Sequence, residues 1–276
     1  MSTETEQRRR EELAAFLRSR RARVDRAALH LPPVARSRVP GLRREEVAAL
    51  AGVSSTWYTW LEQARPINPS RSVLEAIARL FALSASESDY LLRLGGHTGI
   101  PLTAEGSTVP VHLQRLLESV SGPAFLLASN WSIVAWNAAY ERLYTRVSTL
   151  EPEERNLLWL VFTDAALREL MPDWHTQSRR FAGEFRASAG PAIGTAELSD
   201  LVRRLSAASP EFAEVWAERD VETFSSRERV FDHPVDGRVV YDEHKLLPVD
   251  APGHQLVWYL ETAAERRGER GDGAAR

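Results

Sequence analysis

The stretch REEVAALAGVSSTWYTWLEQA, residues 44–64, contains two short helical patterns separated by a single glycine. In the first pattern, Val47, Leu50 and Ala51 recur at helical spacing and share one face. Gly52 follows and can adopt a positive φ at little steric cost, so the chain can turn sharply there. The sequence therefore predicts a short helix, a tight turn and a second helix.

The second helix is predicted to keep a polar face away from the core. Ser54 is a suitable N-cap for this helix. Tyr58 and Leu61 are three residues apart, so both should face inward. The residues that then point outward are Ser55, Thr56, Thr59 and Trp60. A polar outward face on such a helix is typical of an element that enters the DNA major groove.

With its flanks, the stretch PGLRREEVAALAGVSSTWYTWLEQAR resembles the helix-turn-helix of the XRE family, the lambda repressor and Cro type. The resemblance covers about residues 10–94 and implies an all-α, lambda-repressor-like DNA-binding domain. It also implies that arginines at the start of the first helix hold phosphates while the second helix lies along base edges. The proline-rich loop before the motif adds two further arginines beside this face. The DNA-binding residues expected on this basis are Arg36, Arg38, Arg43, Arg44, Ser54, Ser55, Thr56, Trp57, Thr59, Trp60 and Arg65.

The sequence departs from the family pattern at Ala64, where relatives commonly have glycine after the second helix. Alanine tolerates a positive φ poorly. We therefore expect the chain to leave the second helix differently here.

The N-terminal part carries an excess of positive charge. Residues 1–96 contain 16 arginines and 11 acidic residues, whereas residues 97–276 contain 19 basic and 27 acidic residues. A basic module beside an acidic remainder suits one part that meets phosphates and another that does not. The alternative for residues 1–96 is a helical bundle that mediates protein contacts only.

Size and composition favour an intracellular protein with two domains. At 276 residues, the chain is long enough to bury two cores of ordinary size. The absence of cysteine excludes disulfides and cysteine metal sites and fits a reducing cytoplasm. The longest apolar run, LLWLVF at 157–162, is far short of the roughly 20 residues that span a bilayer. Lysine occurs once, at Lys245, among many arginines, which is typical of a GC-rich bacterial genome. We expect a cytoplasmic location.

Changes of composition divide the chain. We predict a helix-turn-helix domain over residues 1–96, a linker over 97–110, a second domain over 111–264 and a disordered tail over 265–276. The linker is rich in glycine, proline and threonine and lacks apolar periodicity. The tail combines glycine with charge and so cannot bury apolar surface.

Residues 111–264 are predicted to form an α+β domain with one antiparallel sheet. After a first helix, two strands should meet at a turn at Ser129-Asn130, and a helix should begin at Asn137. Further helices fit residues 155–171, 173–190, 195–208 and 209–220, and three β segments fit 222–234, 237–249 and 254–263. Strands, then helices, then strands are typical of an α+β fold with a single sheet.

The phrases AFLLASNWSIVAWNAAY, RNLLWLVF, SPEFAEVWAERDV and DHPVDGRVVYDE, in this order, resemble the MmyB-like ligand-binding domain, a PAS-like fold. The resemblance extends over about residues 108–262. It implies a small-molecule sensor, and relatives are associated with fatty-acid-like or antibiotic-related ligands.

Aromatic and basic side chains are the candidates for a ligand pocket in this domain. Ligand pockets are mostly apolar, with a few convergent polar groups. Arg179 or Arg186 could pair with an acidic head group through its planar guanidinium. Packing in the core is the alternative role for each aromatic residue, and exposure to solvent for each polar one. The ligand-binding residues expected are Phe125, Trp136, Tyr140, Phe162, Trp174, His175, Arg179, Phe185, Trp216, His233 and Tyr241.

No catalytic motif stands out in the sequence. It contains no GxGxxG, P-loop, GxSxG or HExxH pattern. The spacings of His233, His244 and His254 match no compact metal site. We therefore expect that the protein is not an enzyme and that it binds no cofactor and no metal ion.

Together these features predict a transcriptional regulator that binds a double-stranded DNA operator. One small helix-turn-helix contacts only a few base pairs, so a homodimer on paired half-sites is expected. A small apolar or amphipathic, fatty-acid-like ligand in the C-terminal domain would modulate binding. The alternative is a regulator whose C-terminal domain serves only dimerisation or protein contacts.

Overall fold

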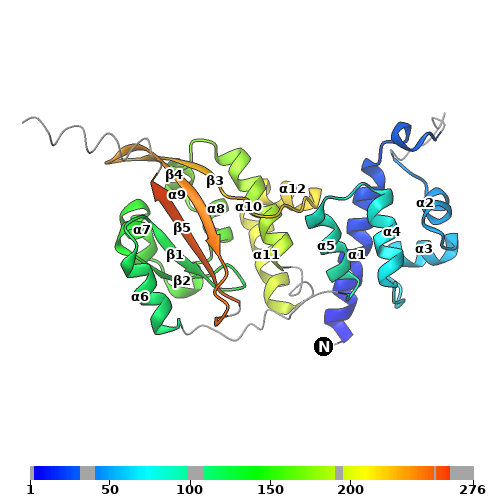
Figure 1. Cartoon of the computed structure of the whole chain (residues 1–276), viewed down its shortest axis with the longest axis horizontal. Coiled ribbons are helices and arrows are strands. Elements are labelled where there is room, and N and C mark those ends of the chain that lie inside the picture. The colour runs from blue at the N-terminus through cyan, green and yellow to red at the C-terminus, as the bar shows by residue number, and fades with distance from the viewer. Residues whose placement is uncertain (1–2, 32–40, 98–108, 190–194, 252, 262–276) are drawn as a thin grey trace, which may run out of the picture. The chain divides into compact units, whose positions relative to one another are not determined.

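The computed structural model describes residues 3–31, 41–97, 109–189, 195–251 and 253–261 (Figure 1). The chain forms two compact units, and neither is continuous in sequence. The first, here called the helical unit, comprises Met1–Pro101, Arg186–Ser206 and Ala213–Glu222. The second, here called the sheet unit, comprises Leu102–Phe185, Ala207–Phe212 and Thr223–Arg276. Much of the stretch 186–222 therefore belongs to the unit that contains the N-terminal helices.

The helical unit is built around the predicted helix-turn-helix. Its elements are α1 (Thr3–Arg23), the short 3-10 helix η1 (Ala27–Leu29), α2 (Arg44–Ala51), α3 (Ser55–Glu62), α4 (Arg71–Leu80) and α5 (Ala85–Leu94), with parts of α10 (Trp174–Ala189), α11 (Ala196–Ala208) and α12 (Pro210–Glu218). Its core combines apolar residues from α1, α2, α3, α4 and α5. Tyr58 and Leu61 are buried in this core, which confirms the inward face predicted for the second helix.

One residue of the motif faces the other way from its prediction. Leu50 is 51% exposed, whereas Val47 and Ala48 are buried and Ala51 is partly buried. The buried stripe of α2 therefore runs through Val47 and Ala48. α2 is only about two turns long. If the helix is rotated about its axis by part of a turn relative to the predicted orientation, Leu50 faces solvent.

The turn and the N-cap of the motif form at the residues that the sequence predicts. Gly52 has a φ of 70° at the C-terminus of α2, and the Ser54 hydroxyl accepts a hydrogen bond from the Trp57 N–H at 3.1 Å. Both confirm the predicted turn and N-cap. The expectation at Ala64 is wrong: this residue adopts a φ of 57°, the left-handed conformation that glycine would take. In this conformation the Arg65 N–H donates a hydrogen bond to the Trp60 carbonyl at 3.0 Å, which satisfies a carbonyl at the end of α3.

The sheet unit contains one five-stranded sheet, as predicted. Its strands are β1 (Ala124–Leu127), β2 (Ile133–Trp136), β3 (Arg227–His233), β4 (Gly237–Leu246) and β5 (Gln255–Glu261). They follow the order β2-β1-β5-β4-β3, and each neighbouring pair is antiparallel. Its remaining elements are α6 (Val111–Ser119), α7 (Ala138–Leu143), η2 (Thr145–Ser148), η3 (Pro152–Glu154), α8 (Leu157–Thr163), α9 (Ala165–Leu170) and the first part of α10.

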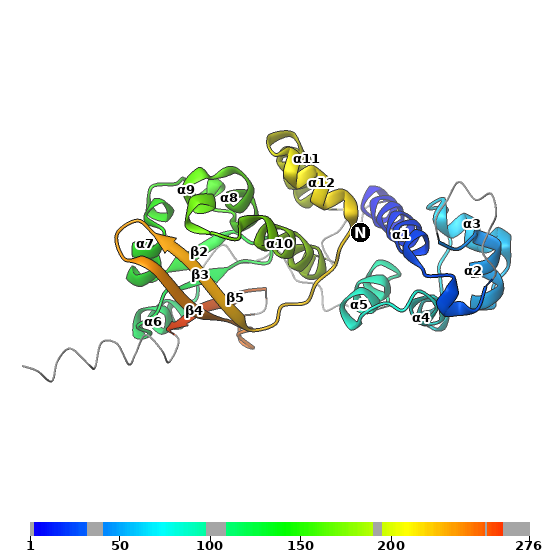
Figure 2. The ribbon, with the colours of Figure 1, turned by 90° about the horizontal axis from the view of Figure 1, so that it is seen from above.

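The two faces of the sheet pack against different helices (Figure 2). Leu113 and Leu117 of α6 pack with Ala124, Leu126 and Leu256, which share one face of the sheet. On the other face, Phe125, Phe231 and Tyr259 form part of an aromatic cluster with Tyr140 of α7. The second face therefore carries the aromatic cluster of this unit.

Two predicted elements differ from the structure. The helix expected over 155–171 is divided into α8 and α9, because Asp164 ends the first and its side chain accepts a hydrogen bond from the Leu167 N–H at 2.9 Å. The strand expected from residue 222 begins at Arg227, which pairs with Glu243 in the register of β3 and β4.

Other predicted features lie wholly or mostly outside the described residues. These are the proline-rich loop with Arg36 and Arg38, most of the linker at 97–110, and the tail at 265–276. Within the described part of the chain, no helix is long and apolar enough to cross a membrane.

Candidate functional site

The outward face of α3 presents polar and aromatic side chains to solvent. Ser55 and Thr56 are exposed, Thr59 is half-buried, and Trp60 is 46% exposed. Trp57 is partly buried and packs against the core of the helical unit. The accessible surface of the helix is therefore formed by its first turn and by Trp60.

Arginines flank this face. Arg43, Arg44 and Arg65 are all exposed, at the start of α2 and just after α3. The Nε of Arg44 lies 2.6 Å from a carboxylate oxygen of Glu62, and its side chain remains 46% accessible. Arg44 is thus held in place on one side while the rest of its guanidinium faces solvent.

Glu62 connects three helices at the end of α3. Its carboxylate is fully buried and accepts hydrogen bonds from Arg21 of α1 at 2.6 and 3.1 Å as well as from Arg44 of α2. Burial alone would raise the pKa of Glu62, but the two guanidinium groups lower it below its ordinary value. Arg18 adds a hydrogen bond to the Glu62 carbonyl. A buried carboxylate with two cationic partners fixes the end of α3 against α1 and α2.

Glu46 performs a similar task at the start of α2. Its carboxylate accepts hydrogen bonds from the Arg43 N–H at 2.7 Å and from both terminal nitrogens of Arg26 at 2.6 and 2.8 Å. The Arg26 hydrogen bonds are the main reason why the pKa of Glu46 falls to about 2. This carboxylate therefore stays ionised over the physiological range and stabilises the N-terminus of α2.

A small cavity lies between the aromatic face of the sheet and the helices of the sheet unit. The cavity measures about 20 Å³, room for about one water molecule. Its walls come from α7, α8, α9, α10, β3 and β5 and the residues that directly follow α7 and α9. The lining residues are Tyr140, Leu143, Tyr144, Leu157, Val161, Leu167, Leu170, Met171, Phe181, Arg229, Phe231 and Tyr259.

A second, open pocket of about 390 Å³ lies next to this cavity. Leu143, Tyr144 and Leu170 line both, so these three side chains form the wall between them. The open pocket also contains the basic side chains of Arg142 and Arg146.

Arg229 is the charged residue at the internal cavity. It is 2% exposed, and its guanidinium lies 4.9 Å from the ring of Phe181. It donates hydrogen bonds to Gln177 and to the Met171 sulfur, and it lies 3.7 Å from a carboxylate oxygen of Glu243. Arg229 thus brings a buried positive charge to the wall of the cavity, and Glu243 is its carboxylate partner among the described residues.

The same ionic cluster continues away from the cavity. Glu184 pairs with Arg227 and with Lys245, whose Nζ lies 2.6 Å from it, while Glu243 pairs with Arg227 at 3.3 Å. Burial disfavours the charged form of Arg227, but the two carboxylates raise its pKa above the ordinary value. The cluster joins three cations to two carboxylates, so a further anion would complete its charge balance.

Comparison with protein families gives two matches that together cover most of the sequence. Residues 109–270 match the MmyB-like transcription regulator ligand binding domain. Residues 12–91 match a helix-turn-helix domain. The chain belongs to the MmyB-like transcription regulators. No curated protein matches the sequence.

The two matches confirm the regulator architecture inferred from the sequence. The protein is a transcription regulator with an N-terminal helix-turn-helix domain for DNA and a C-terminal domain for a ligand. Within the regulator's described residues, no three histidine or acidic side chains are grouped where they could hold a metal ion.

The structure brings only two of the predicted ligand residues to the pockets. Tyr140 lines the internal cavity, and His233 lines the open pocket. The His233 Nδ1 accepts a hydrogen bond from the Asp236 N–H at 3.0 Å, and its Nε2 lies 3.0 Å from the Arg142 carbonyl oxygen. His233 therefore stabilises the rim of the open pocket.

The other predicted ligand residues lie elsewhere in the regulator. Trp174 and Phe162 pack on each other in the core, and Phe185 packs on Trp131. Trp216 belongs to the helical unit, as does Arg186. The remaining predicted residues also line neither of the two pockets: Phe125, Trp136, His175, Arg179 and Tyr241.

Sequence reasoning missed Arg229, Tyr144 and the buried pair of Arg21 and Glu62. A signal for Arg229 exists in the strand RERVFDH, where alternation places it on the same face as Phe231 and His233. A signal for Glu62 also exists, because it follows buried Leu61 and lies four residues after buried Tyr58. Tyr144 follows a short helix, and nothing in the local sequence marks it as a pocket residue.

Proposed function

We propose that this regulator binds a palindromic or repeated operator as a cytoplasmic homodimer, with α3 in the major groove. The exposed face of α3, flanked by Arg44 on its Glu62 anchor, is the observation that carries this proposal. Base contacts would come from Ser55, Thr56, Thr59 and Trp60, with phosphate contacts from the arginines. Trp57 serves packing more than contact, because it lies partly in the core.

We further propose that a small apolar or amphipathic molecule with an acidic end, such as a fatty acid, binds in the sheet unit and changes operator affinity. The aromatic cavity would take its apolar part, and Arg229 would meet its carboxylate. Because the cavity holds only about one water molecule, binding requires the wall of Leu143, Tyr144 and Leu170 to move. The functional domains would remain 1–96 and 111–264, joined by the linker at 97–110.

The experiment selects the bound sequence from random DNA with the full-length protein and then titrates that operator with and without sodium myristate. We expect myristate to change operator affinity by a factor of about 10, the middle of the usual range for coupled sites. Arg229→Gln should remove the effect of myristate, while Arg142→Gln in the open pocket should weaken it less. An unchanged response in Arg229→Gln would contradict the assignment of the head-group site.

The closed cavity favours one alternative. A C-terminal domain that serves only dimerisation would need no ligand space, and a cavity of about 20 Å³ fits that function. Purified protein without a bound small molecule in native mass spectrometry, together with operator binding that does not respond to myristate, would establish this alternative.

A further inference from the structure

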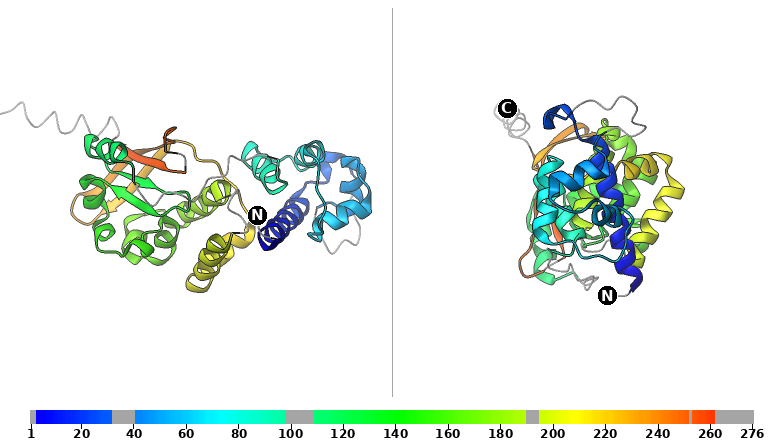
Figure 3. Two further views of the ribbon diagram at one scale, coloured as in Figure 1. Left: turned by 90° about the horizontal axis from the view of Figure 1, so that it is seen from below. Right: turned by 90° about the vertical axis from the view of Figure 1, so that its right-hand side faces the viewer.

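The end of α12 lies against α1 within the helical unit. We call Ala213–Glu222 the latch segment; Figure 3 shows the yellow end of α12 beside the blue α1. In sequence it lies between Ala207–Phe212 and Thr223, both of which belong to the sheet unit. The latch segment is therefore a part of the DNA-binding unit that is tied at both ends to the ligand-binding unit by the chain itself.

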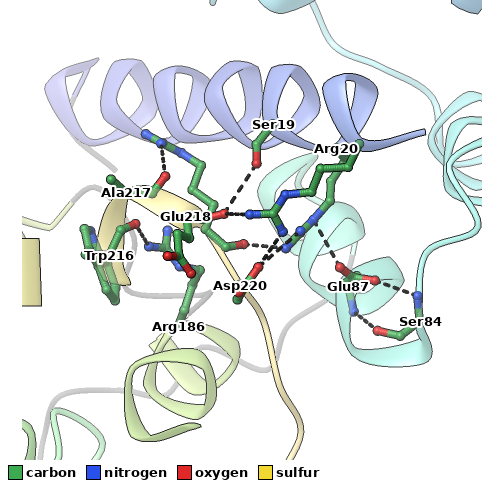
Figure 4. Close-up of polar contacts among 11 residues, drawn as sticks. Ser19, Arg20, Ser84, Glu87, Arg186, Trp216, Ala217, Glu218 and Asp220 are labelled. Carbon is green, nitrogen blue, oxygen red and sulfur yellow. Dashed lines mark hydrogen bonds and ion pairs between the residues drawn. The ribbon is translucent and has the colours of Figure 1, made fainter. Parts of the chain in front are cut away.

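Two arginines of α1 hold the latch segment (Figure 4). Arg20 and Arg23 both pair with the carboxylate of Asp220. Arg20 also donates to the Arg219 carbonyl, and Arg23 donates to the Glu218 carbonyl at 2.7 Å. The polar face of α1 therefore recognises a carboxylate and two consecutive backbone carbonyls.

The backbone of the latch segment is shaped for this contact. Arg219 has a φ of 57°, which ends α12 and turns the chain. Val221 then enters the core of the helical unit and is only 7% exposed. A left-handed non-glycine residue costs free energy, so the contacts that follow it must compensate.

A second anchor comes from α10, which precedes α11 and α12 in the chain. Arg186, at the end of α10, is 2% exposed at its side chain and pairs with Glu12 of α1 at 2.7 Å. Its guanidinium also donates to the Trp216 carbonyl and lies 3.7 Å from the Trp216 ring. Glu12 accepts a further hydrogen bond from the Tyr90 hydroxyl at 3.0 Å, which adds α5 to the cluster. α1 is thus fastened to the 186–222 region at both of its halves.

α1 connects these anchors to the recognition helix. Arg20 pairs with Glu87 of α5 at 3.1 Å, and the next residue, Arg21, holds Glu62 at the end of α3. Burial by itself would raise the pKa of Asp220, but Arg23 and Arg20 lower it below its ordinary value, so its carboxylate is ionised near neutral pH. A change at the latch segment therefore acts on Arg20, and Arg20 is adjacent to Arg21, which holds Glu62 at the end of α3.

We propose that docking of the latch segment on α1 holds α1, and through Arg21 and Glu62 the recognition helix, in the arrangement that binds DNA. The ligand-binding domain then controls operator affinity by releasing or securing Asp220 and Val221. This inference rests on the proposed operator binding. A ligand needs only to favour one state of the latch segment over the other, because differential affinity is what shifts a two-state equilibrium.

The test compares Asp220→Asn with Asp200→Asn in the full-length protein. Asp200 is the matched control, because Asp200→Asn loses the same charge but, among the described residues, Asp200 pairs with Arg203 and Arg204 of its own helix and not with α1. In Asp220→Asn, amide hydrogen exchange should rise about 5-fold or more in the second half of α1 and at the end of α3. Operator affinity should fall about 3- to 10-fold, because a smaller fraction of molecules is competent to bind. Asp200→Asn should change neither.

A double-mutant cycle isolates the contact itself. Arg23→Ala and Asp220→Ala should each weaken operator binding, and the double variant should be little worse than either single variant. Exchange in α1 that is equal in Asp220→Asn and Asp200→Asn would overturn the latch. Increased exchange with unchanged operator affinity would overturn its coupling to DNA. If the wild-type protein selects no operator, the proposed function fails, and exchange at the end of α3 still decides whether the latch holds that helix.

Discussion

Ala64 holds a left-handed backbone conformation directly after the recognition helix. Its φ of 57° costs an L-residue about 1 kcal/mol or more relative to glycine. We expect Ala64→Gly to raise the free energy of unfolding by about 0.5–1 kcal/mol, after allowance for the greater chain entropy of glycine. Ala49→Gly, on the exposed side of α2, should instead lower it by about 1 kcal/mol. Urea unfolding curves measure both; a loss of stability in Ala64→Gly would show that the strain is relieved elsewhere.

Glu46 predicts how acid affects the helix-turn-helix. Its pKa of about 2 in the folded state lies below its unfolded value of about 4.3. Its stabilising effect is therefore complete above about pH 4.5 and is lost as the pH falls from there toward 2. We expect Glu46→Gln to flatten the loss of stability in this window and to lower stability at pH 7. Thermal unfolding from pH 2 to 7 tests this, and parallel curves for the two proteins would contradict it.

At the scale of the element, α3 separates affinity from discrimination. Thr56→Ala should reduce the preference for operator over random DNA by about 1 kcal/mol or more while the fold survives, because base-edge contacts carry sequence information. Arg44→Ala should weaken both kinds of binding and reduce the salt slope by about one unit. Arg21 still pairs with Glu62 in that variant, so the helix stays anchored. Binding to operator and to random DNA, measured over a range of salt concentrations, distinguishes these effects. An unchanged preference for operator in Thr56→Ala would show that other residues contact the bases.

Asn137 joins three elements of the sheet unit. Its carbonyl oxygen accepts from the Ala124 and Tyr140 N–H groups, and its amide donates to the carbonyls of Gly122, Leu117 and Val120. Because Asn137→Ala would leave several buried groups without partners, we expect a loss of about 3 kcal/mol in the free energy of unfolding. Asn130→Ala removes one exposed contact to the Ser132 N–H and should cost well under 1 kcal/mol. Equal losses in the two variants would show that water replaces the buried network.

The elements were more predictable than the site because they depend on local patterns. The helix-turn-helix, the helix that begins at Asn137 and the single antiparallel sheet all follow from apolar periodicity, glycine and capping residues. The pocket depends on which aromatic side chains face each other across helices and strands that are far apart in sequence. Tyr140 and Phe185 were equal candidates as aromatic residues of this domain, yet only Tyr140 reaches the cavity. Asp164 shows the same limit for helices, since a single capping side chain divided one predicted helix into two.

At the scale of the whole molecule, sequence order does not match structural membership. Arg186 was expected at a ligand pocket for its planar guanidinium and Trp216 for its aromatic ring, but both belong to the helical unit. Arg186 pairs with Glu12 of α1, 174 residues away along the chain, and it also donates a hydrogen bond to the Trp216 carbonyl. Long-range pairing of this kind leaves no local pattern in the sequence.

Because Ala213–Glu222 belongs to the helical unit, a mutation in this segment should destabilise the helical unit and not the sheet unit. Val221 is buried in the core of the helical unit, so Val221→Ala should destabilise that unit by about 1–2 kcal/mol. Two units with separate cores unfold with some independence. Amide exchange should therefore rise roughly 5- to 30-fold in the most protected amides of α1 and α4 and change little in β1.

Two controls accompany this measurement. Val235→Ala makes the same change at a residue that is 85% exposed, and it should leave exchange unchanged throughout. Leu126→Ala empties a site in the core of the sheet unit and should raise exchange in β1 but not in α4. If Val221→Ala instead raised exchange in β1 and spared α1, the latch segment would belong to the sheet unit in solution, and the path from Asp220 to Glu62 would lose its first step.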